Sequence, residues 1–548
     1  MWTSDIAREI KERRISGIIF QHEMEPAHNK PEDIARAKEL LVEALGEEWV
    51  TDDPVILIGY SRDQGPFPST YSHLVIMPET TEEVAQVYKI ANECKVDVIP
   101  MGTGLTTMGL HIPMYGGILM DLRRMDKVLE VDGENMYMTI QPGVNYLLAQ
   151  AEAQKVGCRV LNPSTAATAG VISNHAFCNI NTLASKYGFG IDNIIDVTMV
   201  MPDGTILKTG PSALGSVKAH VPGPGPDMTS LFRYAYGTLG TVTEMTLRTY
   251  PEQEHLCSIY PTYDEDDLQN VIEVLYKVAN ENLTLELAHM QNSFYGIFIG
   301  ATNKQAAAIA GAMPRNNLFT MFSGMTEEEA QLKADIIERE ISKIGPDWEF
   351  MPVEAMEDLV GDLRSVNLDR WQKYFNVTVR VMRVRGSFLI GALIGNLDSF
   401  LETEHHMRVA TSDQVGHTED NLPPDDASTY LQPYHMGRAA YMEYDLYSNQ
   451  GDKEDNMRMF TTYMRAMMVA MLQDGLALAA GIVPLTKGLP APIPEGLPKL
   501  DDLMPLLLPS VAVFTDVFSE FKMTVDPNNI ANRRWEYETG LCKKMHLA

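Results

Sequence analysis

Cysteine is scarce in this sequence. Five occur among the 548 residues and they lie far apart, at Cys94, Cys158, Cys178, Cys257 and Cys542. No two of them form a C-x-x-C pair, so neither a cysteine zinc site nor an internal iron–sulfur cluster is expected. A small, odd number of scattered thiols is typical of a reducing compartment.

Basic residues are also in the minority. There are 44 Lys and Arg residues against 74 Asp and Glu residues, which gives a formal net charge of −30. Such a surface would repel the phosphates of nucleic acid and of anionic membranes, so both are excluded as partners. Solvation alone explains an acidic surface, and the surface would also suit a protein that docks a basic electron carrier.

Long apolar runs are missing too. No uncharged apolar stretch approaches the ~20 residues that a membrane-spanning helix needs. The first residues, Met1–Ile6, lead into a charged helical stretch rather than an apolar signal segment. We therefore expect a soluble, cytoplasmic protein. A length of 548 residues, 45% of them apolar, favours two domains.

The most informative feature that is present is a glycine-punctuated loop. Residues 96–99 form an apolar run that predicts a strand, and Pro100–Gly109 follows directly. Upstream, Leu74–Pro78 predicts a strand, and Thr80 with Glu83 predicts a capping box that opens a helix. This order is a β-α-β unit. Because glycine has no side chain, such a loop can present backbone N–H groups to a diphosphate.

The remainder of the first half predicts further α+β structure. Strands are expected at residues 117–121, 136–141 and 194–201. A second helix follows Pro142–Val144, with Leu147, Leu148 and Ala151 on its apolar face. This domain is expected to end near Tyr250 and Pro251.

From about residue 252 the pattern changes. Strand-like runs at 284–289, 294–299 and 318–322 precede a helix that Thr326 caps and Gly345 ends. A strand at 440–447 and a long helix at 453–474 follow. Repeated strand and helix units predict an antiparallel sheet backed by helices. Residues 514–535 are expected to return to the first domain.

Several short motifs stand in order along the chain: Met77–Val84, Pro100–Gly104, Gln141–Val144, Lys186–Gly188, Asp192–Ile194, Pro202–Gly204, Gly237–Glu244 and Asp526–Ile530. In this order the sequence resembles FAD-linked oxidoreductases of the vanillyl-alcohol oxidase and p-cresol methylhydroxylase superfamily. The resemblance implies an α+β fold: a two-part FAD-binding domain of the p-cresol methylhydroxylase (PCMH) type at 51–251, a ferredoxin-like cap domain for the substrate at 252–505, and a return to the FAD domain at 506–548. An N-terminal helical segment, 1–50, precedes them.

The resemblance also implies FAD as the cofactor. Its diphosphate would lie on the glycine loop, held by the N–H groups of residues 101–106, and its isoalloxazine would face the cap. The implied cofactor-binding positions are Pro100, Met101, Gly102, Thr103, Gly104, Leu105, Thr106, Gly109, Pro163, Ser164, Thr168, Gly170, Ser173, Asn174, Gly188, Val242 and Asn532. His175 is a further pocket candidate, because relatives usually carry a small residue there.

Two branches of the superfamily remain open. The branch that oxidises 2-hydroxy acids matches at Gly225–Phe232, but its metal-binding motif is eroded: only a His and a Gly survive in His435–Met442, and Ala479–Pro484 offers no ligand side chains. One donor cannot hold a metal, so no catalytic metal is expected. The branch that oxidises para-substituted phenols matches better at Pro100–Gly104. Its members hold a phenolate with tyrosines and arginine.

Candidate catalytic residues come from the cap. His435 is the first choice for a base, since imidazole titrates near neutral pH. Arg438 and Arg380 could pair with a carboxylate or phenolate, and Tyr441 begins a strand expected to face the flavin. A structural role is the alternative for each: a histidine bonded to backbone, an arginine in an ion pair, and, favoured for Tyr441, an aromatic residue of the core. Further aromatic and cationic candidates are Tyr374, Arg383, Arg385 and Tyr434, and His405, His406 and His417 are candidates for covalent FAD attachment.

The leading hypothesis is a FAD-dependent dehydrogenase or oxidase. It would remove a hydride from a small alcohol or 2-hydroxy acid to flavin N5 and pass the electrons to a separate acceptor, such as an acceptor protein. One alternative is oxidation of a para-substituted phenol or aromatic alcohol. Another is a non-catalytic, flavin-holding electron-transfer subunit. The resemblance further implies a homo-oligomer, because dimers are common among such proteins.

Overall fold

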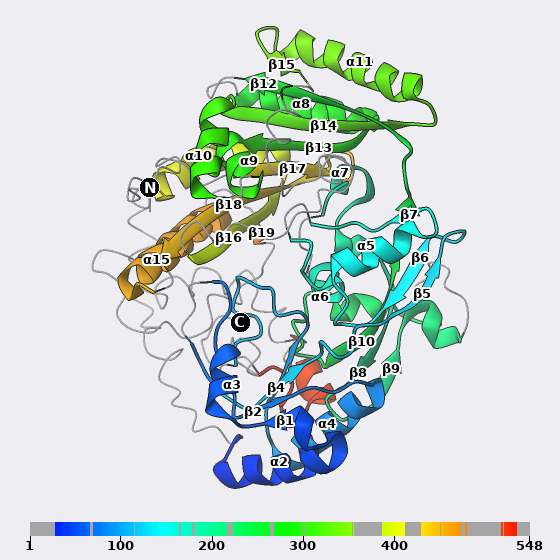
Figure 1. Ribbon diagram of the computed structural model, residues 1–548, viewed down its shortest axis with the longest axis vertical. Coiled ribbons are helices and arrows are strands. Elements are labelled where there is room, and N and C mark those ends of the chain that lie inside the picture. The colour runs from blue at the N-terminus through cyan, green and yellow to red at the C-terminus, as the bar shows by residue number, and fades with distance from the viewer. Residues whose placement is uncertain are drawn as a thin grey trace.

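The computed structural model of the protein describes residues 28–65, 69–113, 115–163, 166–177, 181–215, 223–263, 268–299, 302–352, 355, 386–411, 429–449, 451–472, 477–478, 517–518 and 520–533. In Figure 1 the blue and cyan elements of the first half lie below a layer of green to orange strands and helices. The expected α+β architecture is confirmed.

The first sheet has the strand order β1-β2-β4-β3. Its strands are β1 (Val50–Thr51), β2 (Leu74–Ile76), β3 (Val98–Met101) and β4 (Ile118–Asp121), and its helices are α2 (Pro31–Leu45), α3 (Pro54–Gly59) and α4 (Thr81–Cys94). β2 and β3 both pair in parallel with β4, and α4 connects them, which confirms the β-α-β unit. Thr80 is the N-cap: its Oγ1 accepts a hydrogen bond from the Glu83 N–H at 3.1 Å.

Residues 520–533, red in Figure 1, lie against this first sheet. Ala531 forms an isolated parallel bridge with Val98. The fully buried Lys522 ammonium donates to the carbonyls of Thr238 (2.7 Å) and Ala531 (3.1 Å) and to Asp526 Oδ2 (2.9 Å). The chain therefore returns to the first half of the molecule, where a buried ion pair fixes it beside the strand that leads into the glycine loop.

The second sheet is antiparallel, in the order β5-β6-β10-β8-β9. Its strands are β5 (Val128–Asp132), β6 (Tyr137–Ile140), β8 (Ile194–Val200), β9 (Ile206–Lys208) and β10 (Thr241–Arg248), and a separate short pair is β7 (Cys158–Arg159) with β11 (Tyr250–Pro251). The helices beside this sheet are α5 (Tyr146–Gln154), α6 (Val171–Ala176) and α7 (Ala184–Tyr187).

Helix α5 begins where the sequence predicts, but the predicted apolar face was wrong. Tyr146, Ala149 and Ala153 are fully buried, whereas Leu148 is 37% exposed. Tyr146, the first residue of the helix, points into the core and hydrogen-bonds there, so the buried positions follow it at i+3 and i+7. The predicted face, Leu147, Leu148 and Ala151, therefore lies beside the buried one rather than on it.

The cap contains an eight-stranded antiparallel sheet in the order β15-β12-β14-β13-β17-β18-β16-β19. Its strands are β12 (His255–Tyr263), β13 (Thr284–Gln291), β14 (Asn316–Gly324), β15 (Glu349–Met351), β16 (Gly386–Gly395), β17 (Thr429–Tyr434), β18 (Ala439–Asn449) and β19 (Ala477–Leu478). Its helices are α8 (Leu268–Glu281), α9 (Asn292–Ile299), α10 (Asn303–Ala312), α11 (Glu327–Ile344), α14 (Phe400–Thr411) and α15 (Lys453–Leu472). The predicted antiparallel sheet backed by helices is confirmed.

One predicted strand of the cap is a helix. Residues 294–299 belong to α9, which packs closely on α10: a Cβ added at Gly296 would lie 2.3 Å from the Ala306 carbonyl oxygen. A short apolar run is compatible with either a buried strand or a buried helix, so periodicity could not separate them.

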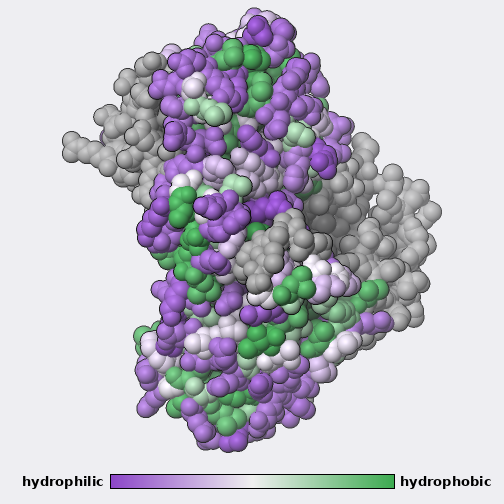
Figure 2. All heavy atoms as spheres, turned by 90° about the vertical axis from the view of Figure 1, so that its right-hand side faces the viewer, coloured by the Kyte–Doolittle hydropathy of each residue, from purple (hydrophilic) through white to green (hydrophobic). Residues whose placement is uncertain are grey.

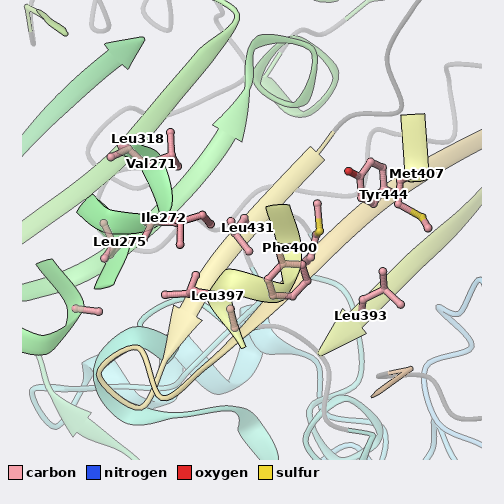
Figure 3. Packing of buried hydrophobic residues seen from close by; sticks show 14 of the residues in the cluster. Val271, Ile272, Leu275, Leu318, Leu393, Leu397, Phe400, Met407, Leu431 and Tyr444 are labelled. Carbon is pink, nitrogen blue, oxygen red and sulfur yellow. The ribbon is translucent and has the colours of Figure 1, made fainter. Parts of the chain in front are cut away.

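One face of the cap sheet packs on its helices. In Figure 3 Val271, Ile272 and Leu275 of α8 meet Leu318 of β14 and Leu431 of β17, while Phe400 and Met407 of α14 lie over Leu393 of β16 and Tyr444 of β18. Ala440, Met442 and Leu446 belong to the same core cluster. Because side chains alternate along a strand, Tyr441, Glu443 and Asp445 of β18 point to the other face of the sheet.

The described surface is largely polar. Hydrophilic residues cover most of the face in Figure 2, with smaller apolar patches between them. No helix in the described ranges combines the length and the apolar content needed to cross a bilayer.

Candidate active site

A cavity of about 290 Å³ lies between the first half of the molecule and the cap sheet. Four groups of residues line it: the glycine loop, the segment around α6, the turn and strand from Phe232 to Val242, and the inner face of β16 and β18. From the cap, the lining residues are Ile390, Ala392 and Glu443.

The glycine loop has fixed ends and free backbone donors. The Met101 carbonyl accepts from the Leu122 N–H (2.9 Å), and the Thr106 carbonyl accepts from the Gln64 N–H (3.1 Å). Within the described part of the chain, the N–H groups of residues 102–106 donate to no protein acceptor. Four of these five residues, Gly102, Gly104, Leu105 and Thr106, line the cavity, and adjacent main-chain donors of this kind suit an anion such as a diphosphate.

Bare backbone is required on both sides of this loop. A Cβ at Gly170, where α6 begins, would lie 2.9 Å from Ser173 Oγ and 3.3 Å from Thr103. Gly237 has a φ of +77°, and a Cβ there would lie 2.6 Å from the Pro100 ring. Side chains at either glycine would move the loop, so the residues present fit a ligand that lies directly against the main chain.

A buried hydrogen-bonded cluster stands behind the α6 wall. Tyr146 Oη lies 2.6 Å from Asn174 Oδ1 and 2.8 Å from His175 Nδ1, and His175 Nδ1 also lies 3.2 Å from the Val171 carbonyl oxygen. Asn174 lines the cavity, whereas His175 is fully buried behind it. Burial lowers the pKa of His175 to about 4, so its imidazole is neutral. The expected pocket role of His175 is thus an indirect one.

On the cap wall, Glu443 brings a buried carboxyl group to the cavity. Tyr441 Oη donates a hydrogen bond to Glu443 Oε2 at 2.8 Å, and Asp445 lies beside it on the same face of β18. Burial raises the pKa of Glu443, while hydrogen bonds from Asp445 and Tyr441 oppose this shift. A carboxylate whose pKa is raised is better suited to accept a proton than an ordinary one.

A second buried carboxyl group lies deeper in the cap. Glu286 accepts hydrogen bonds from the N–H groups of Leu183 and Leu287 and from Gln432 Nε2 (2.7 Å). Burial raises its pKa to about 7. Glu286 does not line the cavity. Its contacts join α7 to β13 and β17, so it connects the cap to the first half.

The predicted cofactor positions divide into three groups. Those that line the cavity are Pro100, Met101, Gly102, Gly104, Leu105, Thr106, Pro163, Gly170, Ser173, Asn174 and Val242. Those described but outside the lining are Thr103, Gly109, Thr168, Gly188 and Asn532. Thr103 packs behind Gly170, Gly109 donates to Asp63, and Asn532 donates to the Tyr236 carbonyl. Ser164 lies outside the described residues.

The structure does not bring the predicted catalytic residues together. His435 Nε2 pairs with Asp192 Oδ2 at 3.1 Å, and His435 lies next to Gly188, outside the lining. Arg438 is exposed and is also outside the lining. Tyr441 faces the cavity side but contacts it through Glu443. The turn between β17 and β18 thus places His435 beside Asp192 and outside the cavity lining.

Other candidates are placed elsewhere. His405 and His406 lie on α14, among the helices that cover the outer face of the cap sheet. Tyr434 packs on Phe189 with ring centroids 4.2 Å apart. The candidates Arg380, Tyr374, Arg383, Arg385 and His417 and the segment 479–484 lie outside the described residues.

Several polar lining residues were not anticipated, among them Glu443, His111 and Gln64. Glu443 could have been found, because it follows Tyr441 at the two-residue spacing that repeats one face of a strand. Among the described lining residues none is Lys or Arg. The described residues also contain no group of three or more His, Cys, Asp and Glu side chains that could hold a metal.

Comparison with known proteins identifies the first half. Residues 72–210 match a family described as "FAD binding domain". The glycolate oxidase subunit GlcD of Bacillus subtilis (strain 168) is 30% identical over 231 residues, which are 42% of this chain and 48% of that protein. A D-lactate dehydrogenase of Anaerostipes hadrus is 27% identical over 349 residues, 62% of this chain and 67% of that protein. The chain spans about half the length of the first curated relatives it matches.

The fold extends over nearly the whole chain. The crystal structure of p-cresol methylhydroxylase with substrate bound superposes with a TM-score of 0.77 at 17% identity, covering 92% of this chain and 97% of that one. The predicted resemblance is confirmed: the protein has the PCMH type of fold and carries a FAD-binding domain, and its cofactor is FAD.

Proposed function

We propose that this chain, a FAD-binding protein with the PCMH type of fold, is an oxidoreductase that oxidises a hydroxyl-bearing carbon of a small molecule. Glu443 would be the base. One observation carries the proposal: the Glu443 carboxyl group is on the cap wall of the same cavity that has free main-chain donors on its opposite wall. Cofactor and substrate would therefore meet in one cavity.

In this proposal the two walls of the cavity have different roles. The N–H groups of residues 102–106 bind the diphosphate of FAD, and the cap supplies the proton acceptor. FAD, when bound, supplies a two-electron hydride acceptor. The substrate loses one hydride from carbon, and its O–H proton passes to Glu443, so the C–O bond becomes a carbonyl with no net charge left behind. Tyr441 keeps the carboxylate oriented by donating to Oε2.

We further propose that the substrate is a neutral alcohol, aliphatic or benzylic. Its hydroxyl would donate to Glu443, and the apolar wall of Ile390 and Ala392 would contact its carbon skeleton. A carboxylate substrate would need a cation, because an unpaired charge in an apolar cavity is costly, and the described lining provides none. We also propose that the protein acts in the cytoplasm as a homo-oligomer and passes its electrons to a separate acceptor, such as an acceptor protein.

A 2-hydroxy acid is the second candidate substrate. In its favour, glycolate oxidase and D-lactate dehydrogenase are the names of curated relatives. For this class, Arg380 would have to reach the cavity and pair with the carboxylate. A para-substituted phenol is a third candidate substrate class, because p-cresol methylhydroxylase has the same fold as this chain.

Anaerobic reduction of the bound flavin tests the proposal. The holoprotein is mixed with primary and benzylic alcohols, 2-hydroxy acids and para-alkylphenols, and the loss of flavin absorbance near 450 nm is followed. Bleaching by neutral alcohols alone supports the first candidate, and bleaching by 2-hydroxy acids alone supports the second. If no class bleaches the flavin while dithionite does, the chain is a flavin-holding protein without this activity.

A further inference from the structure

We propose that Tyr146 and His175 are positioning residues that hold the Asn174 amide with its N–H donors directed at the flavin ring of bound FAD. Nothing in the family match or in the names of the relatives assigns this role. The proposal depends on FAD binding, and it is independent of the substrate and of Glu443.

The direction of each hydrogen bond follows from one carbonyl group. The Val171 carbonyl oxygen, 3.2 Å from His175 Nδ1, can only accept, so Nδ1 must carry the proton of the neutral imidazole. His175 Nδ1 therefore donates to Tyr146 Oη, 2.8 Å away, as well. Its Nε2 is left as a buried acceptor without a partner in the described residues, which agrees with an unprotonated nitrogen.

The direction of the His175–Tyr146 hydrogen bond determines the direction of the next one, between Tyr146 and Asn174. Since its oxygen accepts from His175, its single proton is available for Asn174, and the 2.6 Å contact must be O–H to Oδ1. The opposite orientation of the amide would place the Asn174 NH2 against a hydroxyl already satisfied. The side-chain carbonyl of Asn174 is thus held toward α5, and its NH2 group faces the other way.

The NH2 group of Asn174 is on the side of the cavity. Asn174 lines this cavity, and among the described residues its printed side-chain hydrogen bond uses Oδ1, which leaves Nδ2 available on the cavity side. An amide NH2 group on the wall of a cavity can donate to an acceptor on the ligand that the cavity binds.

The position of Asn174 along the wall indicates which part of FAD supplies that acceptor. Ser173, one residue earlier, lies 3.6 Å from a Cβ placed on Gly102 of the glycine loop. Phe177, three residues later, packs against the core of the cap. Asn174 thus lies between the loop that would hold the diphosphate and the cap wall, and its NH2 group would donate to the flavin ring of bound FAD. Donors at the flavin ring strengthen its binding and stabilise the charge of its reduced form.

Tyr146→Phe tests the relay, because it removes one oxygen and keeps the ring in the core. We expect FAD to bind about three- to tenfold more weakly, the loss typical of one hydrogen bond, and the midpoint potential of the flavin to become more negative. Asn174→Ala should show the same two changes. Tyr250→Phe is the matched control, since Tyr250 also donates to an asparagine, Asn193, but neither residue lines the cavity.

The double variant Tyr146→Phe/Asn174→Ala decides between a relay and two separate contacts. If Tyr146 acts through Asn174, the double variant loses no more affinity or potential than Asn174→Ala alone. Additive losses would overturn the proposal, as would a Tyr146→Phe protein with the affinity and potential of the Tyr250→Phe control. Thermal unfolding of each apoprotein separates a folding defect from a binding defect. Asn174→Ala keeps the Tyr146–His175 contact, so it remains informative if Tyr146→Phe does not fold.

Discussion

Replacing Glu443 with glutamine is the sharpest test of the proposed chemistry. The change is nearly isosteric. The carbonyl oxygen of the substituted amide can still accept the 2.8 Å hydrogen bond from Tyr441, so the wall of the cavity keeps its shape. Only the capacity to take a proton is lost. General-base catalysis contributes about 10²- to 10⁴-fold, so the rate of flavin reduction by substrate should fall by that factor. This corresponds to about 3–5 kcal/mol in the barrier.

Stopped-flow reduction under anaerobic conditions measures this step apart from reoxidation. The dissociation constant of FAD should not change, because the diphosphate is held on the opposite wall. His435→Gln is the matched control: it introduces the same amide at a residue that pairs with Asp192 outside the lining, and it should leave the rate unchanged. A Glu443→Gln enzyme that keeps the wild-type rate, or a His435→Gln enzyme that loses it, would refute the assignment of the base.

The pH profile gives an independent check of the same residue. Since burial raises the pKa of Glu443, the rate of flavin reduction should fall as the pH is lowered through that raised pKa. Tyr441→Phe removes a donor that stabilises the carboxylate. The pKa of Glu443 should then rise further, because the hydrogen bond from Tyr441 that lowers it is lost, and the fall in rate should move to higher pH. A profile that Tyr441→Phe does not move would exclude Glu443 as the titrating base.

Three further substitutions test the framework around the site. Gly237→Ala should weaken FAD binding about tenfold or more, because its new Cβ would displace Pro100 at the start of the glycine loop. Gly215→Ala is the control, since Gly215 also has a positive φ, +99°, but a Cβ there meets open space. Titration of each apoprotein with FAD measures the affinity. Lys522→Met should lower the unfolding free energy by about 3–5 kcal/mol, because it leaves the buried carboxylate of Asp526 without a cation. Lys277→Met, which removes one partner of an exposed ion pair, is the control and should lower it by at most about 1 kcal/mol. Thermal unfolding measures both variants. Glu286→Gln should destabilise the protein most at low pH. In the wild type a folded-state pKa near 7 means that protonation of Glu286 stabilises the fold below pH 4.5, by up to about 3 kcal/mol, and that this contribution is lost as the pH rises through 7. Urea unfolding at pH 5 and 8 should therefore show that the loss of unfolding free energy in the variant, relative to the wild type, becomes smaller at pH 8.

The elements that the sequence predicts well are those with a local signal. The capping hydroxyl of Thr80 and the Thr326–Gly345 boundaries of α11 follow from backbone chemistry within a few residues. Two elements with no such signal were assigned wrongly. The α9 helix is specified by its contact with α10, and the buried face of α5 is specified by the polar partners of Tyr146. In each case tertiary packing overrides the local pattern.

The same distinction separates the two walls of the cavity. The glycine loop could be located from the sequence because main-chain donors need only small residues at a fixed spacing after a strand. The catalytic side could not, since it depends on which residue of β18 the sheet turns toward the first half. The histidine and arginine of the β17–β18 turn have the more reactive side chains, yet the turn takes them outward. Alternation along the strand, rather than residue type, was the signal to use.

This division also limits what the relatives can say about the substrate. The family match ends at residue 210, so it includes the main-chain donors of the glycine loop and Asn174, but not Glu443 or its neighbours on β16. Proteins can therefore share the cofactor wall and differ entirely in the groups that contact substrate. The structural match with p-cresol methylhydroxylase covers most of the chain, but at 17% identity it shows a shared fold and says nothing of the side chains on the cap sheet. The substrate class that we propose therefore depends on the cap of this protein itself, where the buried carboxyl group of Glu443 shares the cavity wall with the apolar residues Ile390 and Ala392.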